Sequence, residues 1–294
     1  MPSKSFIDFL KYERRYSHHT VTAYQSDLAQ FFEYLEKQFE ITEPKSVTHQ
    51  QIRSWVVSLI EEGLHNNSIN RKISCLKAYF KYLKRTGAID INPMNKVVAP
   101  KAGTRLPVFV EEKSMEALFA PEWFEKNFEG QRDALVIELF YNTGIRLSEL
   151  INIKESNLDL TKRQLKVLGK RNKERIIPIS PNLATIIEAY LALKQSENFG
   201  NRGVHLIVKK DGDKLYEKLV YRIVNRYLSL VTTLKKKSPH VLRHTFATHM
   251  LNKGADLGAI KELLGHSSLA ATQLYTHNSI EQLKDVHRKA HPKG

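Results

Sequence analysis

Apolar side chains in the first part of the chain recur at steps of three and four residues, a spacing that gathers them on one face of a helix. The clearest run begins after Ser17, a suitable N-cap, and covers residues 18–38, with Val21, Tyr24, Leu28, Phe31, Phe32 and Leu35. Similar runs cover residues 3–15, with Phe6, Phe9, Leu10 and Tyr12 facing inward, and the stretches from Thr48 to Gly63 and from Asn67 or Ser68 to Gly87. Short connections join the four runs, so the sequence predicts a small four-helix bundle.

The polar face of the fourth run suggests a ligand. It carries Asn70, Arg71, Lys72 and Lys77. Side chains of these types reach phosphates and base edges when a helix lies in the major groove of DNA. An ordinary solvated face would have the same composition, so both interpretations remain open at this stage.

The charge of the whole chain favours a polyanionic partner. Its 294 residues have a formal net charge of +15, which suits nucleic acid, although a merely basic soluble protein would also fit. Cys75 is the single cysteine, so no intramolecular disulfide can form, and its apolar neighbours indicate a buried thiol. The sequence shows no signal peptide and no apolar run of membrane-spanning length. We therefore expect a cytoplasmic protein.

A break in the periodicity separates two domains. Residues 92–107 contain three prolines and one glycine without a sustained period. We expect a helical domain over 1–95, a linker over 96–107 and a second domain over 108–294. Lys101 and Arg105 in the linker are candidates for contacts with a DNA backbone.

The second domain combines helices with one β-hairpin. Leu165 and Val167 alternate with charged residues, and a second strand is predicted from Arg175. The loop of this hairpin is basic, with Lys170, Arg171, Lys173 and Arg175. Helices are expected near residues 112–119, 131–141, 181–194, 216–232, 240–252, 256–264, 268–276 and 279–289. The predicted class is mainly α with a small β-hairpin.

The stretch from Ser238 to His277 carries the candidate chemistry. Four of its side chains, two imidazoles, a guanidinium and a phenol, lie at the edges of helical patterns: His240, Arg243, His266 and Tyr275. Together they suggest a phosphate site with a nucleophile. His240 and His244 have a spacing that metal ligands can use, but no carboxylate or cysteine completes a metal signature, and we predict no metal site. Tyr141, Tyr190 and Tyr221 lie in apolar stripes and are expected in the core.

Five motifs, in order, resemble the tyrosine recombinase (phage integrase) family, most closely its Xer-type bacterial members. They are T-G-I-R-L-S-E-L, L-G-K-R-N-K-E-R, S-P-H-V-L-R-H-T-F-A-T-H, E-L-L-G-H-S and T-Q-L-Y-T-H. The resemblance covers essentially the whole chain. It implies an N-terminal four-helix, SAM-like core-binding domain that grips DNA, and a mixed α/β catalytic domain.

The resemblance also implies a role for each candidate. Tyr275 corresponds to the nucleophile, which forms a 3′-phosphotyrosyl link, and Arg146 and Arg243 to the arginines that clamp the scissile phosphate. His266 corresponds to a residue that donates a hydrogen bond to the phosphate. Lys170 corresponds to the general acid for the leaving 5′-oxygen, and His240 to the base that accepts the tyrosine proton. No metal or nucleotide cofactor is implied. Arg146 by itself would more often be a surface arginine.

For partners, the resemblance implies a double-stranded recombination site, a homo- or hetero-tetramer with a related recombinase, and an FtsK-type DNA translocase. In the family, the segment matching the last helix docks into a neighbouring protomer, which we expect here, although it could fold back on its own domain. Resolution of chromosome dimers is the leading function. Integration of a mobile element, DNA binding without catalysis and topoisomerase IB activity are the alternatives.

Overall fold

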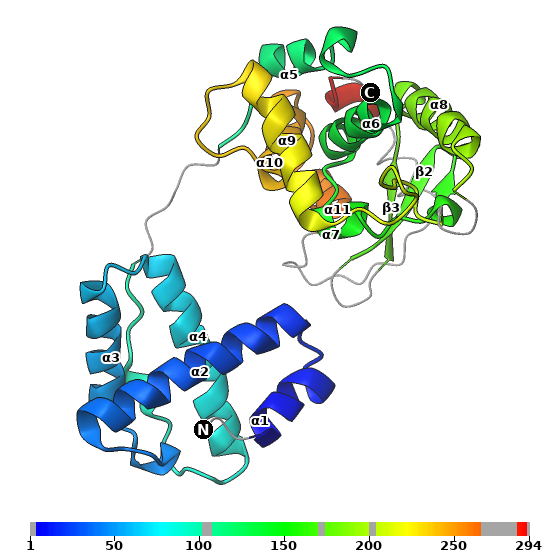
Figure 1. Cartoon of the computed structure of the whole chain (residues 1–294). Helices are drawn as coiled ribbons and strands as arrows, with labels where there is room; N and C mark the ends of the chain where they lie inside the picture. The colour runs from blue at the N-terminus through cyan, green and yellow to red at the C-terminus, as the bar shows by residue number, and fades with distance from the viewer. Residues whose placement is uncertain (1–3, 102–107, 170–173, 200–203, 266–286, 293–294) are drawn as a thin grey trace. The chain divides into compact units, whose positions relative to one another are not determined.

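The computed structural model divides the chain into two compact units, Met1–Arg105 and Leu106–Gly294 (Figure 1). It describes residues 4–101, 108–169, 174–199, 204–265 and 287–292. In this part of the chain, no helix is both long and apolar enough to cross a membrane.

The first unit is a helical bundle with its own core. Its main helices are α1 (Lys4–Asp8), α2 (His18–Phe39), α3 (His49–Glu61) and α4 (Asn66–Arg85). Short 3-10 helices cover Pro44–Ser46 and Pro93–Lys96. The predicted spacing is confirmed in α2, where Val21, Leu28 and Phe31 are buried and Ser17 Oγ accepts from the Thr20 amide at 3.3 Å. The predicted N-cap of α4, Asn67 or Ser68, was wrong by two or three residues, since the helix begins at Asn66 and His65 is its N-cap.

The first helix differs from the expectation. The predicted run over residues 3–15 is α1 followed by a π-helix, Phe9–Glu13. The wider turn carries Tyr12 out of the core, and its side chain is 75% exposed although we expected it to face inward.

The packing of the first unit extends past residue 95. Val97 is buried in its core. The carbonyl of Lys96 accepts from Arg53 Nη2 at 2.8 Å, and that of Lys101 accepts from Asn66 Nδ2 at 2.8 Å. Residues 96–101, which we had assigned to a linker, are therefore fastened to α3 and α4.

The second unit is mainly helical, with one small sheet at its side (Figure 1). Its helices are α5 (Glu112–Leu118), α6 (Phe128–Thr143), α7 (Leu147–Leu150), α8 (Pro181–Ser196), α9 (Glu217–Val231), α10 (Pro239–Asn252) and α11 (Leu257–Leu264). Short 3-10 helices cover Pro121–Trp123 and Glu155–Asn157. Helix α6 is buried on nearly all sides and packs against α8, α9 and α10, so it forms the centre of the domain.

The sheet confirms the predicted hairpin and adds a third strand. Strand β2 (Gln164–Leu168) lies between β1 (Leu158–Asp159) and β3 (Glu174–Pro178), all antiparallel. Val167 is paired with Arg175 and Leu165 with Ile177, so these four side chains share one face. That face is the buried one, and Arg175 lies on it rather than in the hairpin loop.

The end of the chain packs on its own domain. Residues 287–290 are helical. His287 Nε2 contacts the carbonyl of Asn142 at 2.6 Å, and His291 Nε2 contacts that of Tyr141 at 2.9 Å. Ala290 joins a small cluster with Phe246 and Ile260. Residues 287–292 thus pack on their own domain, whereas residues 279–286, most of the last predicted helix, lie outside the described residues, and the docking of that helix into a neighbour stays a prediction.

Candidate active site

Two left-handed glycines shape the site. Gly144 ends α6 at φ +58°, and Gly265 ends α11 at φ +63°. At Gly144 a glycine is also required sterically, because an added Cβ would lie 2.5 Å from Phe246 Cδ1. The two turns bring the ends of α6 and α11 close to the first residues of α7.

Arg146 is the N-cap of α7 and lies directly after the first turn. Its Nη1 donates to Glu149 Oε1 at 2.8 Å, and its backbone amide donates to Glu149 Oε2 at the same distance. Its Nη2 donates to the carbonyl of Gly265 at 2.8 Å. The Arg146 side chain is 31% exposed, so solvent or a ligand can reach the guanidinium.

Arg243 comes from the first turns of α10 and meets the same two helix ends. It donates from Nη1 to the carbonyl of Gly144 and from Nη2 to the carbonyl of Leu264, the latter at 2.6 Å. Burial, together with Arg146 and Arg175, lowers the pKa of Arg243 to about 9. Arg243 therefore remains a cation at neutral pH.

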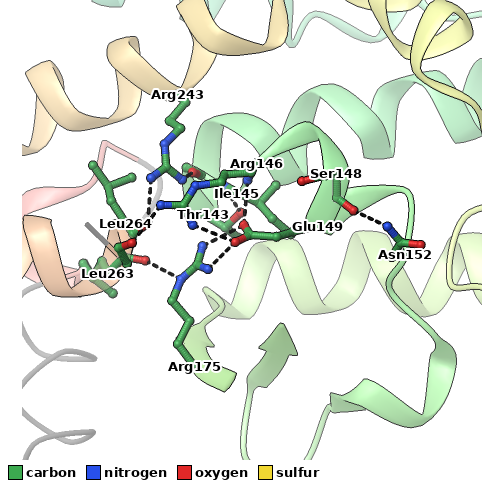
Figure 2. Close-up of polar contacts among 12 residues, drawn as sticks. Thr143, Ile145, Arg146, Ser148, Glu149, Asn152, Arg175, Arg243, Leu263 and Leu264 are labelled. Atoms are coloured by element: carbon green, nitrogen blue, oxygen red, sulfur yellow. Dashed lines mark hydrogen bonds and ion pairs between the residues drawn. The ribbon is translucent and has the colours of Figure 1, made fainter. Parts of the chain in front are cut away.

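A third arginine, Arg175, completes the cluster (Figure 2). Its Nη1 and Nη2 donate to Glu149 Oε1 and Oε2 at 2.6 and 2.9 Å. Burial would raise the pKa of Glu149, but the bonds from Arg175 and Arg146 outweigh it and hold the pKa at about 2. The Glu149 carboxylate is thus shared between two guanidinium groups, with that of Arg243 close by, and the excess positive charge suits an anion such as a phosphate diester.

His240 lies one turn before Arg243 on α10, so the two side chains share a helix face. Its ring is exposed and lies 4.4 Å from that of His244, between centroids. Burial, then His244, Lys236 and Arg243, lower the pKa of His240. A neutral imidazole at physiological pH can accept a proton, as a general base must.

His249 supports the core instead. Its Nδ1 contacts the hydroxyl of Tyr141 at 3.0 Å, and both residues are buried. Tyr190 is buried as predicted, whereas the prediction for Tyr221 was wrong, because 46% of it is exposed on α9.

The structure thus brings Arg146 and Arg243 together and places His240 beside Arg243. The predicted residues Lys170, Arg171, Lys173, Arg105, His266 and Tyr275 lie outside the described residues. Sequence reasoning missed Glu149 and Arg175, although both lie in motifs quoted above. The available signals were the i, i+3 spacing of Arg146 and Glu149 and the strand alternation that turns Arg175 inward with Ile177.

The candidate DNA contacts of α4 divide into three kinds. The expectation for Lys72 was wrong: it is 4% exposed, and its Nζ lies 3.1 Å from Asp27 Oδ1 and 5.8 Å from the centre of the Trp55 ring. Arg71 pairs with the same carboxylate, but its side chain is 45% exposed. Asn70 Nδ2 donates to the carbonyl of Pro100 at 3.0 Å, and Lys77 is exposed.

A basic hollow on α9 was not foreseen. It is lined by Tyr221, Arg222, Asn225, Arg226 and Lys237. None of these residues is acidic. Arg222 and Arg226 are nevertheless held in place, by Tyr216 Oη at 2.6 Å and by Glu125 Oε1 at 3.1 Å.

Comparison with known proteins decides the family. The model of the phage integrase family matches residues 109–282, and that of the phage integrase N-terminal SAM-like domain matches residues 4–87. The chain belongs to the phage integrase family of tyrosine recombinases. Its relatives include tyrosine recombinase XerC of Chlorobaculum parvum, 38% identical over 98% of this chain and 93% of the relative. XerC of Staphylococcus epidermidis is 40% identical over 99% of this chain and 97% of the relative.

Solved structures of recombinases share the fold. XerH bound to a palindromic difH substrate in a post-cleavage complex has a TM-score of 0.72 at 21% identity, covering 92% of this chain and 80% of XerH. The Tn1549 transposon integrase in complex with circular intermediate DNA has a TM-score of 0.66 at 20% identity, covering 94% of this chain and 96% of the integrase. The chain thus shares its fold with these two structures.

Proposed function

We propose that this tyrosine recombinase cleaves and rejoins DNA at a specific site, and that it resolves chromosome dimers in the cytoplasm at segregation. The observation that carries the proposal is the cluster of Arg146 and Arg175 on Glu149 with Arg243 beside them at the end of α11. It concentrates permanent positive charge where one phosphate can approach Arg146. The XerC relatives, similar over nearly their whole length, support the chromosomal role.

In the proposed reaction the Tyr275 hydroxyl attacks the scissile phosphate. The bond to the 5′-oxygen breaks, and the product is a 3′-phosphotyrosyl link with a free 5′-hydroxyl. His240 takes the phenolic proton, directly or through water, and Lys170 gives a proton to the leaving oxygen. Attack by the 5′-hydroxyl of a partner strand reverses the step, so the energy of the phosphodiester bond is conserved and a Holliday junction forms.

Charge stabilisation falls to the arginines. Negative charge gathers on the non-bridging oxygens in the transition state, and guanidinium groups offer paired donors to such oxygens. Arg146 and Arg243 are fixed through carbonyls and Glu149 before DNA arrives, so little reorganisation is needed. We assign a further hydrogen bond to His266.

DNA would be held by both units. Arg71 and Lys77 on α4, Lys101, Arg105 and the basic loop with Arg171 and Lys173 are candidates for phosphate contacts, and we add the α9 hollow with Arg222 and Arg226. A tetramer on two sites, formed with identical or related recombinases and activated by an FtsK-type translocase, would carry out the exchange.

A plasmid assay tests recombination itself. A plasmid with two directly repeated copies of the site that the protein selects from random DNA should yield two smaller circles with the wild-type protein, alone or with the related recombinase. Tyr275→Phe in every subunit should yield none. In cells, loss of the gene should cause unresolved chromosomes, and blocking homologous recombination should suppress the defect. The proposal would be contradicted if the wild-type protein, with the related recombinase present, bound the plasmid and left it unrecombined.

A further inference from the structure

Arg175 is a buried arginine to which the proposed reaction assigns no role. Its side chain is 5% exposed. All three of its nitrogens are engaged, since Nη1 and Nη2 donate to Glu149 and Nε donates to the carbonyl of Leu263 at 3.0 Å. A permanently charged group in such surroundings is retained only where its partners are fixed.

The partners of Arg175 belong to two different parts of the site. Glu149 also accepts from the guanidinium and the backbone amide of Arg146, so each of its oxygens receives two bonds. Leu263 lies at the end of α11, directly before the carbonyls that Arg243 and Arg146 contact. The carbonyls of residues 263, 264 and 265 thus accept from Arg175, Arg243 and Arg146 in turn.

We propose that Arg175 is a positioning residue for strand cleavage, which acts through Glu149 to aim Arg146 and through Leu263 to hold the end of α11. The proposal rests on the recombinase function proposed above. Arg175 itself is too deeply buried to contact DNA, so its effect must pass through these neighbours. Without Arg175, Glu149 could still bind Arg146, but no second arginine would hold the carboxylate in its orientation.

Lysine cannot replace Arg175 in this role. A single ammonium nitrogen would have to serve Glu149 Oε1, Glu149 Oε2 and the Leu263 carbonyl at once, and it lacks the planar fork that matches a carboxylate. Arg175→Lys therefore keeps the charge while it removes the geometry. This makes it a test of positioning rather than of charge.

The experiment is a double-mutant cycle with full-length protein. The wild type, Arg175→Lys, Glu149→Gln and the double variant are mixed with a nicked suicide duplex that carries the selected site, and covalent complex formation is timed. Arg175→Lys should slow it by roughly 10- to 100-fold, as misplaced catalytic groups do, with DNA affinity within about twofold. The double variant should be no more than about threefold slower than the slower single variant, because both changes act through one carboxylate.

A matched control and a second variant guard against misfolding. Arg132 is also a buried arginine, but it pairs with Asp133 on α6, and Arg132→Lys should leave the cleavage rate within about twofold. Arg175→Gln keeps amide donors without the charge and should also bind DNA while cleaving slowly.

Four results would overturn the inference. The first is a wild-type cleavage rate in Arg175→Lys, and the second is a rate loss in the double variant equal to the product of the two single losses. The third is a loss of DNA affinity in Arg175→Lys as large as its loss of cleavage rate. The fourth is unfolding of both Arg175 variants at the assay temperature. The last would make Arg175 a stability residue only. A wild-type protein that binds the duplex without forming the complex, even with the related recombinase, would instead contradict the proposed function, and the inference would fall with it.

Discussion

Arg146 Nη2 donates to the carbonyl of Gly265 at 2.8 Å, although the two residues are 119 positions apart in the chain. The bond joins the start of α7 to the end of α11. The arginine that we assign to the phosphate thus also holds the backbone of Gly265, the residue before His266 in the sequence. The turn at Gly265 is thus part of the site, and it gives the first prediction.

Gly265→Ala should impair cleavage more than stability. The left-handed φ of +63° costs a side chain about 1–2 kcal/mol, and the new Cβ would also meet Arg175 Cδ at 3.1 Å. Gly254→Ala is the control, since Gly254 has φ +84° with nothing within 4 Å of an added Cβ. We expect both variants to lose a similar amount of unfolding free energy. Only Gly265→Ala should slow covalent complex formation, by at least about tenfold. Equal cleavage rates would contradict this account of the turn.

Lys72 and Lys77 should separate stability from DNA binding. Lys72→Met removes one of two cations from the buried Asp27 and should cost about 1–3 kcal/mol of unfolding free energy. It should leave the salt dependence of DNA binding unchanged. Lys77→Met should change stability by less than about 0.5 kcal/mol and reduce the salt slope by about one. A reduced slope for Lys72→Met, with stability intact, would restore Lys72 as a DNA contact.

The rate of single-turnover cleavage should fall at acidic pH as His240 becomes protonated. The base must be neutral, and burial and neighbouring cations lower the pKa of His240 below its ordinary value near 6.5. The cleavage rate should therefore fall to half its maximum only below pH 6.5. His244→Gln removes one cause of the shift, so the fall in rate should move to higher pH. His205→Gln should leave it in place, because His205 is not among the groups that shift the pKa of His240. A pH dependence of the cleavage rate that is the same in His244→Gln and the wild type would argue against His240 as the base.

His287 should make stability fall in mild acid. Burial lowers its pKa, so the unfolded chain binds a proton more readily than the folded one. Stability is then complete above the unfolded pKa near 6.5 and is lost as pH falls below it. Gln at this position can still donate to the Asn142 carbonyl without titrating, so His287→Gln should weaken the change in melting temperature between pH 7 and pH 5. An unchanged pH dependence would show that His287 is not responsible.

Helical periodicity and motifs predicted the helices and the hairpin, but they did not predict which charged residues are buried. Within the described residues the predicted helices and hairpin agree closely with the structure, because apolar spacing reports burial directly, whereas the helix expected at 268–276 and most of that at 279–289 lie outside them. Lys72 was misassigned because Lys reads as a surface residue, although its place three after Ile69 and four before Leu76 lies in the apolar stripe. Asp27 occupies a matching inward position on α2, and only the pairing of the two helices brings these opposite charges together.

The same limit applies to the site. Arg146, His240 and Arg243 were found from motifs, whereas the partnership of Glu149 with Arg175 depends on contact between α7 and β3, which no local pattern reveals. The third strand was missed because its two residues are too few to show an alternation. The contacts of His287 and His291 with carbonyls at the end of α6 were not foreseen either, because they join residues 145 and 150 positions apart in the chain.

The most direct test of the central claim is covalent capture. A suicide duplex, nicked beside the scissile phosphate so that the released fragment diffuses away, is incubated with wild-type protein or Tyr275→Phe, with a chelator present and with the related recombinase added in a parallel arm. We predict a covalent protein–DNA band on a denaturing gel for the wild type and none for Tyr275→Phe. A band that persists in Tyr275→Phe, or no band in either arm on DNA that the wild type binds, would contradict the account.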